Sequence, residues 1–214
     1  MHSSFNLIAS TGQVVTHTLK DSWAWYLIRA SGLAALTLLV LLMTSGIGHV
    51  TGWTYKLMAP VKAWAVHKAM AILLAVSVTL HLAGLLVDHY VRFSLLQEFI
   101  PFLKNYTNGT TLFGLDVTYL AIPLGILAMY GTYIVTLSSL DSVGWIRNHK
   151  KLWQVIHISS YVTIIFAIIH VLSVGTDFKE SGWRLLAIVT LVVLVIATIA
   201  RLLRANFLAK EPND

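Results

Sequence analysis

Cysteine is absent from the 214 residues, and charge is scarce, since Asp, Glu, Lys and Arg together make up only 11% of the chain. The absence of cysteine excludes disulfides, thiolate metal sites, c-type haem attachment and cysteine-ligated iron–sulfur clusters. Soluble domains are about 25% charged, whereas 57% of this chain is hydrophobic. The net charge of +6 is spread along the chain rather than gathered into one run, which argues against nucleic acid as a partner. The composition therefore predicts a membrane protein.

Five apolar stretches are long enough to cross a hydrocarbon core about 30 Å thick as α-helices. They cover residues 23–47, 65–87, 117–140, 152–174 and 183–200. Tryptophans near the starts of most of these stretches are typical of side chains anchored at the membrane interface. We therefore predict an all-α membrane domain over residues 23–200, a bundle of about five transmembrane helices. An outer N-terminal tail would cover residues 1–22 and a cytoplasmic tail residues 201–214.

Lysine and arginine are divided unequally between the two ends of this predicted bundle, and cytoplasmic loops normally carry the excess. Six of these residues, mixed with acidic side chains, belong to one end. The other end holds Lys56, Lys62, Lys68, Arg147, Lys150, Lys151, Arg201, Arg204 and Lys210. We therefore expect the C-terminus in the cytoplasm and the N-terminus outside, in a bacterial inner membrane.

Four histidines lie within two of the apolar stretches. His67 and His81 are fourteen residues apart, and His157 and His170 are thirteen apart. At a rise of about 1.5 Å per residue, either spacing separates two imidazoles by roughly 20 Å, which fits two stacked sites within the membrane. Ionisable side chains at membrane depth are functional by default, and neutral imidazole is a good metal ligand. Two haem irons, each with one axial imidazole from either stretch, are the simplest occupants.

The thirteen-residue spacing does not fit an ideal helix. At about 100° per residue, fourteen residues return to within about 40° of the starting face, whereas thirteen leave the second side chain about 140° away. The stretch that contains His157 and His170 is therefore predicted to bend, to change its winding, or to present its two haems at different azimuths.

The second nitrogen of each imidazole is expected to donate to a carbonyl or hydroxyl group that fixes the tautomer. A bond to a carbonyl one turn back in the same helix is the commoner role of a helical hydroxyl. The hydroxyl candidates within the two stretches are Ser77, Thr79, Ser159, Ser160 and Thr163.

The longest predicted connection, residues 89–116, contains an apolar piece at residues 93–103 that is too short to cross the membrane. This piece either roofs the outer haem or rests on lipid as a surface helix. Asn105 and Asn108 match glycosylation acceptors. The remaining histidines fall in predicted tails or loops, where we expect solvated or interfacial side chains. They are His2, His17, His49, His89 and His149.

Residues 67–81, which begin His-Lys-Ala-Met-Ala and end in histidine, resemble the first haem-binding helix of the ferric reductase and NADPH oxidase transmembrane domain. Residues 152–170, which begin Leu-Trp-Gln-Val-Ile-His, resemble the second haem-binding helix of that family. Arg29-Ala-Ser is similar to an arginine motif near the family's outer haem. The resemblance covers roughly residues 23–200.

This resemblance implies that His67 and His157 are the iron ligands of an inner b-type haem and that His81 and His170 bind an outer one. It places Arg29 beside the outer haem, where pairing with a propionate would offset the cost of a guanidinium inside the membrane. The implied function is transmembrane electron transfer by a di-haem cytochrome b. A cytoplasmic flavoprotein or a membrane quinol would donate electrons to an external acceptor or periplasmic redox partner.

The chain also departs from the family. Family members commonly have one more transmembrane segment and often a C-terminal module for flavin and nicotinamide, whereas no glycine-rich nucleotide motif follows a predicted strand here. The oxidases carry a further histidine at the position of Leu85, so dedicated superoxide production is not expected. A bacterial haem-only relative, such as the membrane partner of the periplasmic methionine sulfoxide reductase, is a closer analogue. We therefore expect an oxidoreductase component that needs a separate donor protein.

Two alternatives remain open. The protein would be a quinol-oxidising cytochrome b anchor subunit if it co-purified stably with a catalytic subunit of a larger redox complex. It would be a non-redox membrane protein, with packing or ion-binding histidines, if the purified protein were colourless. Sparse charge within the apolar stretches argues against a transporter.

Overall fold

The computed structural model describes residues 2–89, 91–104, 111–112, 114–140, 148–179 and 181–208, with side chains from residue 22 to residue 200 except that of residue 181. Asn105 and Asn108, the predicted glycosylation acceptors, lie outside the described residues, as do Arg147 and Lys210. The side chains of Arg201 and Arg204 are likewise outside the described set.

Five helices are long and apolar enough to cross a membrane. They confirm the predicted all-α membrane bundle, and the chain is an integral membrane protein. The fourth span is built from two consecutive helices, α7 and α8. The spans lie within α1 (His2–Thr51), α3 (Pro60–Val87), α5 (Ala121–Ser138), α7 (Lys150–Ile158) with α8 (Ser160–Val174), and α9 (Ser181–Leu208).

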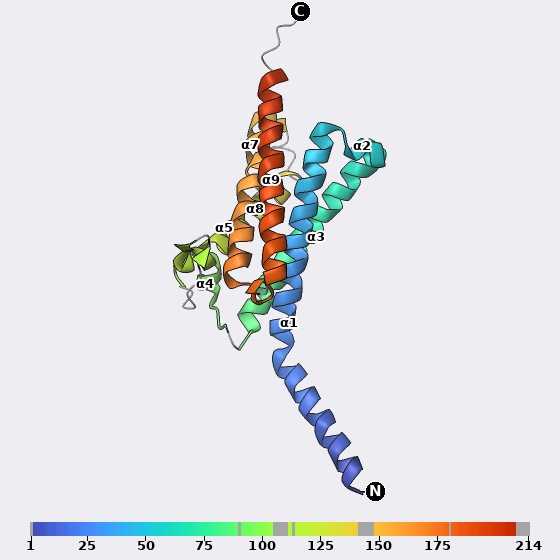
Figure 1. Ribbon diagram of the computed structural model, residues 1–214, viewed down its shortest axis with the longest axis vertical. Coiled ribbons are helices and arrows are strands. Elements are labelled where there is room, and N and C mark those ends of the chain that lie inside the picture. Colours follow the sequence, from blue (N-terminus) through green and yellow to red (C-terminus); the bar gives the residue numbers. More distant parts are fainter. Residues whose placement is uncertain are drawn as a thin grey trace, which may run out of the picture.

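Short elements connect these helices. At one end of the bundle, α2 (Thr54–Leu57) joins α1 to α3. At the other end lie α4 (Leu95–Phe99), the antiparallel strands β1 (Thr111–Leu112) and β2 (Leu115–Asp116), and the 3-10 helices η1 (Thr118–Leu120) and η3 (Thr176–Lys179). The two groups of connections therefore sit at opposite ends of the bundle (Figure 1).

The bundle is organised as two antiparallel helix pairs, α1 with α3 and α5 with α8 (Figure 1). A buried apolar cluster joins the pairs to α9 through Leu39, Leu74, Ile168 and Leu194. Large apolar side chains cover the outward helix faces, as the hydrocarbon of a bilayer requires, because no water is present there to hydrogen-bond exposed polar groups. Small residues permit close helix contact; a methyl group at Gly84 would lie 2.7 Å from a side-chain carbon of Ile28.

The fourth span is interrupted at Ser159, between His157 and His170. Beyond the interruption, the Val162 N–H donates to the Ser159 carbonyl three residues back, at 3.0 Å, whereas an α-helix would use a carbonyl four residues back. A change of winding is one of the departures from ideal geometry that the thirteen-residue spacing requires.

Candidate functional site

Two cavities lie one above the other in the bundle. The inner cavity, toward the α2 end, has a volume of about 730 Å³ and is lined by His67 and His157. The outer cavity, toward the α4 end, has a volume of about 580 Å³ and is lined by His81 and His170. Both volumes fall within the range of about 300–1,000 Å³ that is usual for cofactor sites. The structure thus brings the four sequence-predicted histidines together in the expected pairs.

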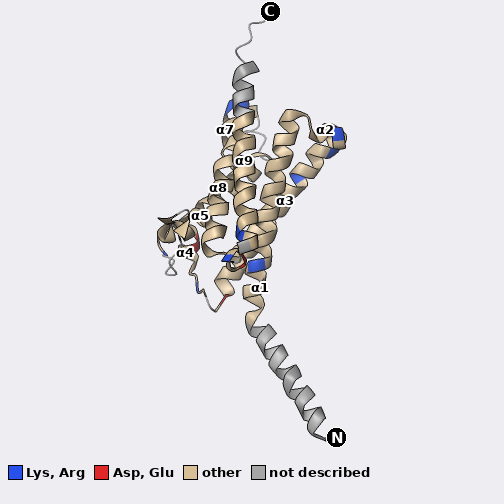
Figure 2. Ribbon diagram, in the orientation of Figure 1, with Lys and Arg blue, Asp and Glu red and all other residues tan. Residues whose placement is uncertain are grey.

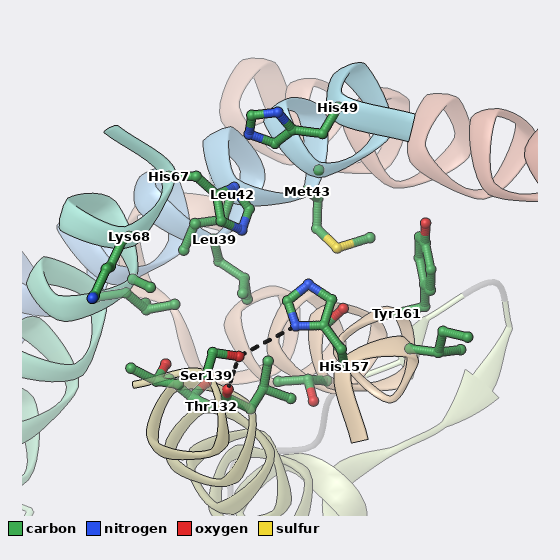
Figure 3. A pocket seen from close by; sticks show the side chains of 18 of the residues that line it. Leu39, Leu42, Met43, His49, His67, Lys68, Thr132, Ser139, His157 and Tyr161 are labelled. Atoms are coloured by element: carbon green, nitrogen blue, oxygen red, sulfur yellow. Dashed lines mark hydrogen bonds between the residues drawn. The ribbon is translucent and has the colours of Figure 1, made fainter. Parts of the chain in front are cut away.

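The two inner imidazoles point toward one another across their cavity (Figure 3), with 6.3 Å between the ring centroids of His67 and His157. Metal–imidazole bonds are about 2 Å long and a ring centre lies about 1 Å behind its bonding nitrogen, so two axial ligands of one metal place their centroids about 6 Å apart. The spacing of this pair therefore fits a single iron between the two rings.

In the inner pair, the Nδ1 atom of each imidazole is held by a serine of the neighbouring helix. His67 Nδ1 lies 2.7 Å from Ser45 Oγ of α1, and His157 Nδ1 lies 3.5 Å from Ser139 Oγ at the end of α5. The hydroxyl of Ser45 donates to the Leu42 carbonyl, and that of Ser139 donates to a carbonyl of its own helix turn. Each serine oxygen therefore accepts from Nδ1–H, so Nε2 is the nitrogen that carries the lone pair in both rings.

In the outer pair, the Nδ1 atoms are held by backbone carbonyls. His81 Nδ1 lies 2.9 Å from the Ile28 carbonyl of α1, and His170 Nδ1 lies 2.6 Å from the Ala121 carbonyl of α5. A carbonyl can only accept, so Nδ1 carries the proton in both rings and Nε2 is the nitrogen with the lone pair. Such a hydrogen bond fixes the orientation of a histidine ligand and raises its basicity.

Glycines open the helix surface to the two outer imidazoles. A helical side chain points back over the preceding turn of its helix. The side chain of residue i+4 therefore normally covers the carbonyl oxygen of residue i. That residue is Gly32 for the Ile28 carbonyl and Gly125 for the Ala121 carbonyl. A methyl group would lie 3.2 Å from the His81 ring at Gly32 and 2.5 Å from His170 Nδ1 at Gly125.

A bare metal ion does not suit these sites. Within the described parts of the chain, no group of three or more His, Cys, Asp or Glu side chains is arranged to hold a metal ion. The outer cavity is lined by two imidazoles and the inner cavity by three, of which His49 stacks on Trp64, whereas protein sites for bare ions usually supply three or four converging ligands. Haem supplies the remaining equatorial nitrogens itself, so the paired imidazoles and the apolar cavity walls fit haem.

Three of the candidate hydroxyls have the role expected to be the commoner one and do not orient an imidazole. Ser159 and Thr163 donate to carbonyls of their own helix turn, and Thr79 does so while contacting the Tyr133 hydroxyl. The partners that hold Nδ1 lie instead on α1 and α5, because a ligand's own helix directs its hydroxyls back along its backbone. One sequence signal could have located them, since Gly32 and Gly46 repeat the fourteen-residue spacing of the first histidine pair.

His49 is buried within α1, which corrects the expectation of a solvated or interfacial side chain in a loop. His49 belongs to α1, its side chain is only 8% exposed, and it lines the inner cavity. Its ring stacks on Trp64 with 4.3 Å between centroids and lies edge-on to His67 at 5.3 Å. The helix continues past the predicted end of the first stretch, which carries His49 inward. His89 and His149 are exposed, as expected.

Arg29 lines the outer cavity, but its guanidinium has a partner that the sequence did not predict. Its Nε and Nη2 donate to the two carboxylate oxygens of Asp177 in η3, with 3.1 Å between Nε and Oδ2. The guanidinium also lies over the Trp25 ring, 4.3 Å from its centroid. A protein carboxylate thus offsets the charge of Arg29, and contact with a haem propionate stays a prediction.

The apolar segment before and around α4 faces the outer cavity, through Phe93, Glu98 and Lys104. This arrangement favours a roof over the outer cavity rather than a helix that only rests on lipid. Burial raises the pKa of the Glu98 carboxyl to about 7 and lowers the pKa of the Lys104 ammonium.

The sequence model of one protein family, described as the ferric reductase like transmembrane component, matches residues 30–168, well over half of the chain. His67, His81 and His157 lie within the matched region, whereas Arg29 and His170 lie just outside it. No curated protein and no solved structure matches the chain.

Alanine substitutions at three glycines test whether the imidazoles need the space that these glycines leave beside them. We expect Gly125→Ala to displace His170 and remove most of the haem absorbance of the outer site, because its methyl group would lie 2.5 Å from Nδ1. Gly32→Ala, at 3.2 Å from His81, should weaken haem retention less, and Gly46→Ala, at 3.7 Å from His67, should have little effect. The measurement is the haem absorbance of each purified variant relative to its amount of protein.

Gly182→Ala in α9 is the matched control, since nothing lies within 4 Å of its added methyl group. Alanine is intrinsically favoured over glycine within a helix by about 1 kcal/mol, so a general loss of helix stability is not expected in any variant. Full haem retention by Gly125→Ala would show that the Ala121 carbonyl does not position His170.

Proposed function

The chain belongs to the ferric reductase-like transmembrane family, and from that premise we propose that it is a di-haem cytochrome b that carries electrons across the membrane. Domains of this family generally bind haem and transfer electrons across membranes. The haem domain would occupy residues 23–200, between tails at residues 1–22 and 201–214.

One observation carries the proposal: four imidazoles of membrane-spanning helices each have Nδ1 hydrogen-bonded to a residue of a neighbouring helix or of its end, and they line two cofactor-sized cavities in pairs. A buried histidine that only packs would be expected to satisfy its polar atoms without lining a cofactor-sized space. In the proposed sites, His67 and His157 bind the inner haem, and His81 and His170 bind the outer one.

The residues of the chain would orient the haems, exclude water and connect the two sites. Each haem supplies an iron centre that accepts and releases one electron. Leu39, Leu74 and Thr132 line both cavities, so a single layer of side chains separates them. Electron transfer between the sites would cross that layer. Neutral imidazole ligands and apolar walls set a low-dielectric environment for the transferred charge.

Charge at the two ends supports an orientation with the C-terminus in the cytoplasm of a bacterial inner membrane. Exposed lysines of α2, α3 and α7 gather at the inner end (Figure 2). They are Lys56, Lys62, Lys68, Lys150 and Lys151. We propose that a cytoplasmic flavoprotein or a membrane quinol reduces the inner haem and that an external acceptor oxidises the outer one. The chain would thus act as an oxidoreductase component with separate redox partners.

Removal of single ligands tests the assignment of the sites. We expect His67→Ala or His157→Ala to remove the inner haem and to leave the outer haem largely intact, because the two pairs have separate anchors. His81→Ala should do the reverse. Haem quantification with redox titration of each variant measures which midpoint potential disappears. Retention of both haems in His67→Ala and His157→Ala would contradict the assignment.

Reversal of the α7 charges tests the nature of the donor. If an acidic flavoprotein docks at the inner end, Lys150→Glu with Lys151→Glu should slow its second-order reduction of the protein by about tenfold or more at low ionic strength. The difference should shrink as salt screens the charges. Stopped-flow reduction by an acidic flavoprotein measures the rate.

Dithionite reduction should be unaffected by that double substitution, since a small reductant needs no docking surface. Lys179→Glu, an exposed charge reversal at the opposite end, is the matched control. Equal flavoprotein rates for the double variant and the wild type at every salt concentration would favour a membrane quinol as the donor.

A further inference from the structure

Glu98 is buried at the α4 end of the protein, and no residue that the structure describes forms a hydrogen bond with its carboxyl group. Its side chain is 2% exposed, and neither Oε1 nor Oε2 has a partner among those residues. Among the described side chains, only His49 also contains buried polar atoms without a partner. Burial of an unpaired carboxylate is unfavourable, and such a group in a native structure calls for a functional explanation.

The position of Glu98 is held by specific bonds. Ser94 caps α4 with a reciprocal pair of bonds to Gln97, which fixes the start of the helix. At the other end of α4, the Tyr130 hydroxyl donates to the Phe99 carbonyl at 2.7 Å. Lys104 donates to two carbonyls of the preceding loop and so closes the segment on itself. These bonds hold Glu98 at the wall of the outer cavity.

The other ionisable groups around this cavity are already bonded. Arg29 pairs with Asp177, and His81 and His170 donate to backbone carbonyls. Lys104 donates to backbone carbonyls, Tyr130 donates to the Phe99 carbonyl, and Asp88 accepts from the Val91 N–H. Among the described side chains near the outer histidine pair, Glu98 is therefore the ionisable group that can gain or lose a proton without breaking a hydrogen bond.

We propose that Glu98 is a proton-binding site coupled to the outer redox site: Glu98 takes up one proton from the external side when the site between His81 and His170 receives one electron. This inference rests on the haem-binding function proposed above. A one-electron reductant supplies the electron, and water supplies the proton that converts the carboxylate to the carboxylic acid. The cavity then gains one negative and one positive charge, so its net charge does not change.

The direction of the coupling follows from charge. Burial alone raises the pKa of Glu98 to about 7, and an added electron in the same low-dielectric cavity would raise that pKa further. Below about pH 7 the carboxyl is neutral before the electron arrives, so no proton is taken up. Above that pH the oxidised protein carries a carboxylate, and reduction is accompanied by proton uptake. The midpoint potential of the outer site should therefore be level in acid and fall with rising pH above neutrality.

Spectroelectrochemical titration of the full-length protein from about pH 6 to about pH 9 tests the inference. The outer midpoint is identified by its persistence in His67→Ala. We expect it to fall above neutrality in the wild type, by up to one proton per electron. In Glu98→Gln, which keeps the shape of the side chain but cannot ionise, it should stay level at the value that the wild type has in acid.

Asp116→Asn is the matched control, because Asp116 is an exposed acid at the same end of the protein; its slope should equal that of the wild type. A level outer potential in the wild type overturns the role of Glu98, as does a slope that persists in Glu98→Gln. Either result leaves the proposed haem function intact. Absence of haem absorbance from the wild type would overturn the proposed function and this inference with it.

Discussion

The hydrogen bond from the Nδ1 atom of each half-buried imidazole to an adjacent helix or its end is the interaction on which the rest of the site depends. A neutral imidazole has one donor and one acceptor nitrogen, and committing Nδ1–H to a fixed acceptor leaves Nε2 for the cavity. His67 and His81 of α3 rely on α1 for that acceptor, and His157 and His170 rely on α5. The helices that carry no ligand are therefore as important to the geometry as those that do.

This constraint explains why small residues occur where they do in α1 and α5. A serine supplies an oxygen at the inner level, whereas at the outer level a glycine four residues after a carbonyl exposes that carbonyl to the ring. The same solution appears in both helix pairs, with Ser45 and Gly32 in α1, and Ser139 and Gly125 near or within α5. Any larger residue at Gly125 would occupy the space of the His170 ring.

Much of the architecture could be predicted from the sequence, because hydrophobic length determines which segments cross a membrane. The five spans, and the pairing of the four histidines by their depth in the membrane, could be predicted without knowing which helices pack against one another. The acceptors of Nδ1, the burial of His49 and the pairing of Arg29 with Asp177 depend on the register between helices. Uniformly apolar helices do not encode that register in their hydrophobic pattern. The sequence feature that comes nearest to indicating this register is the fourteen-residue spacing of Gly32 and Gly46, which equals that of His67 and His81.

The central claim is that two irons are each bound by a pair of neutral imidazoles within the membrane. A dithionite-reduced minus oxidised absorption spectrum, with haem quantification on the purified wild-type protein, tests it most directly. The account predicts low-spin b-type spectra and two haems per chain. A high-spin spectrum, or a preparation that binds one haem or none when haem is supplied in excess, would contradict it.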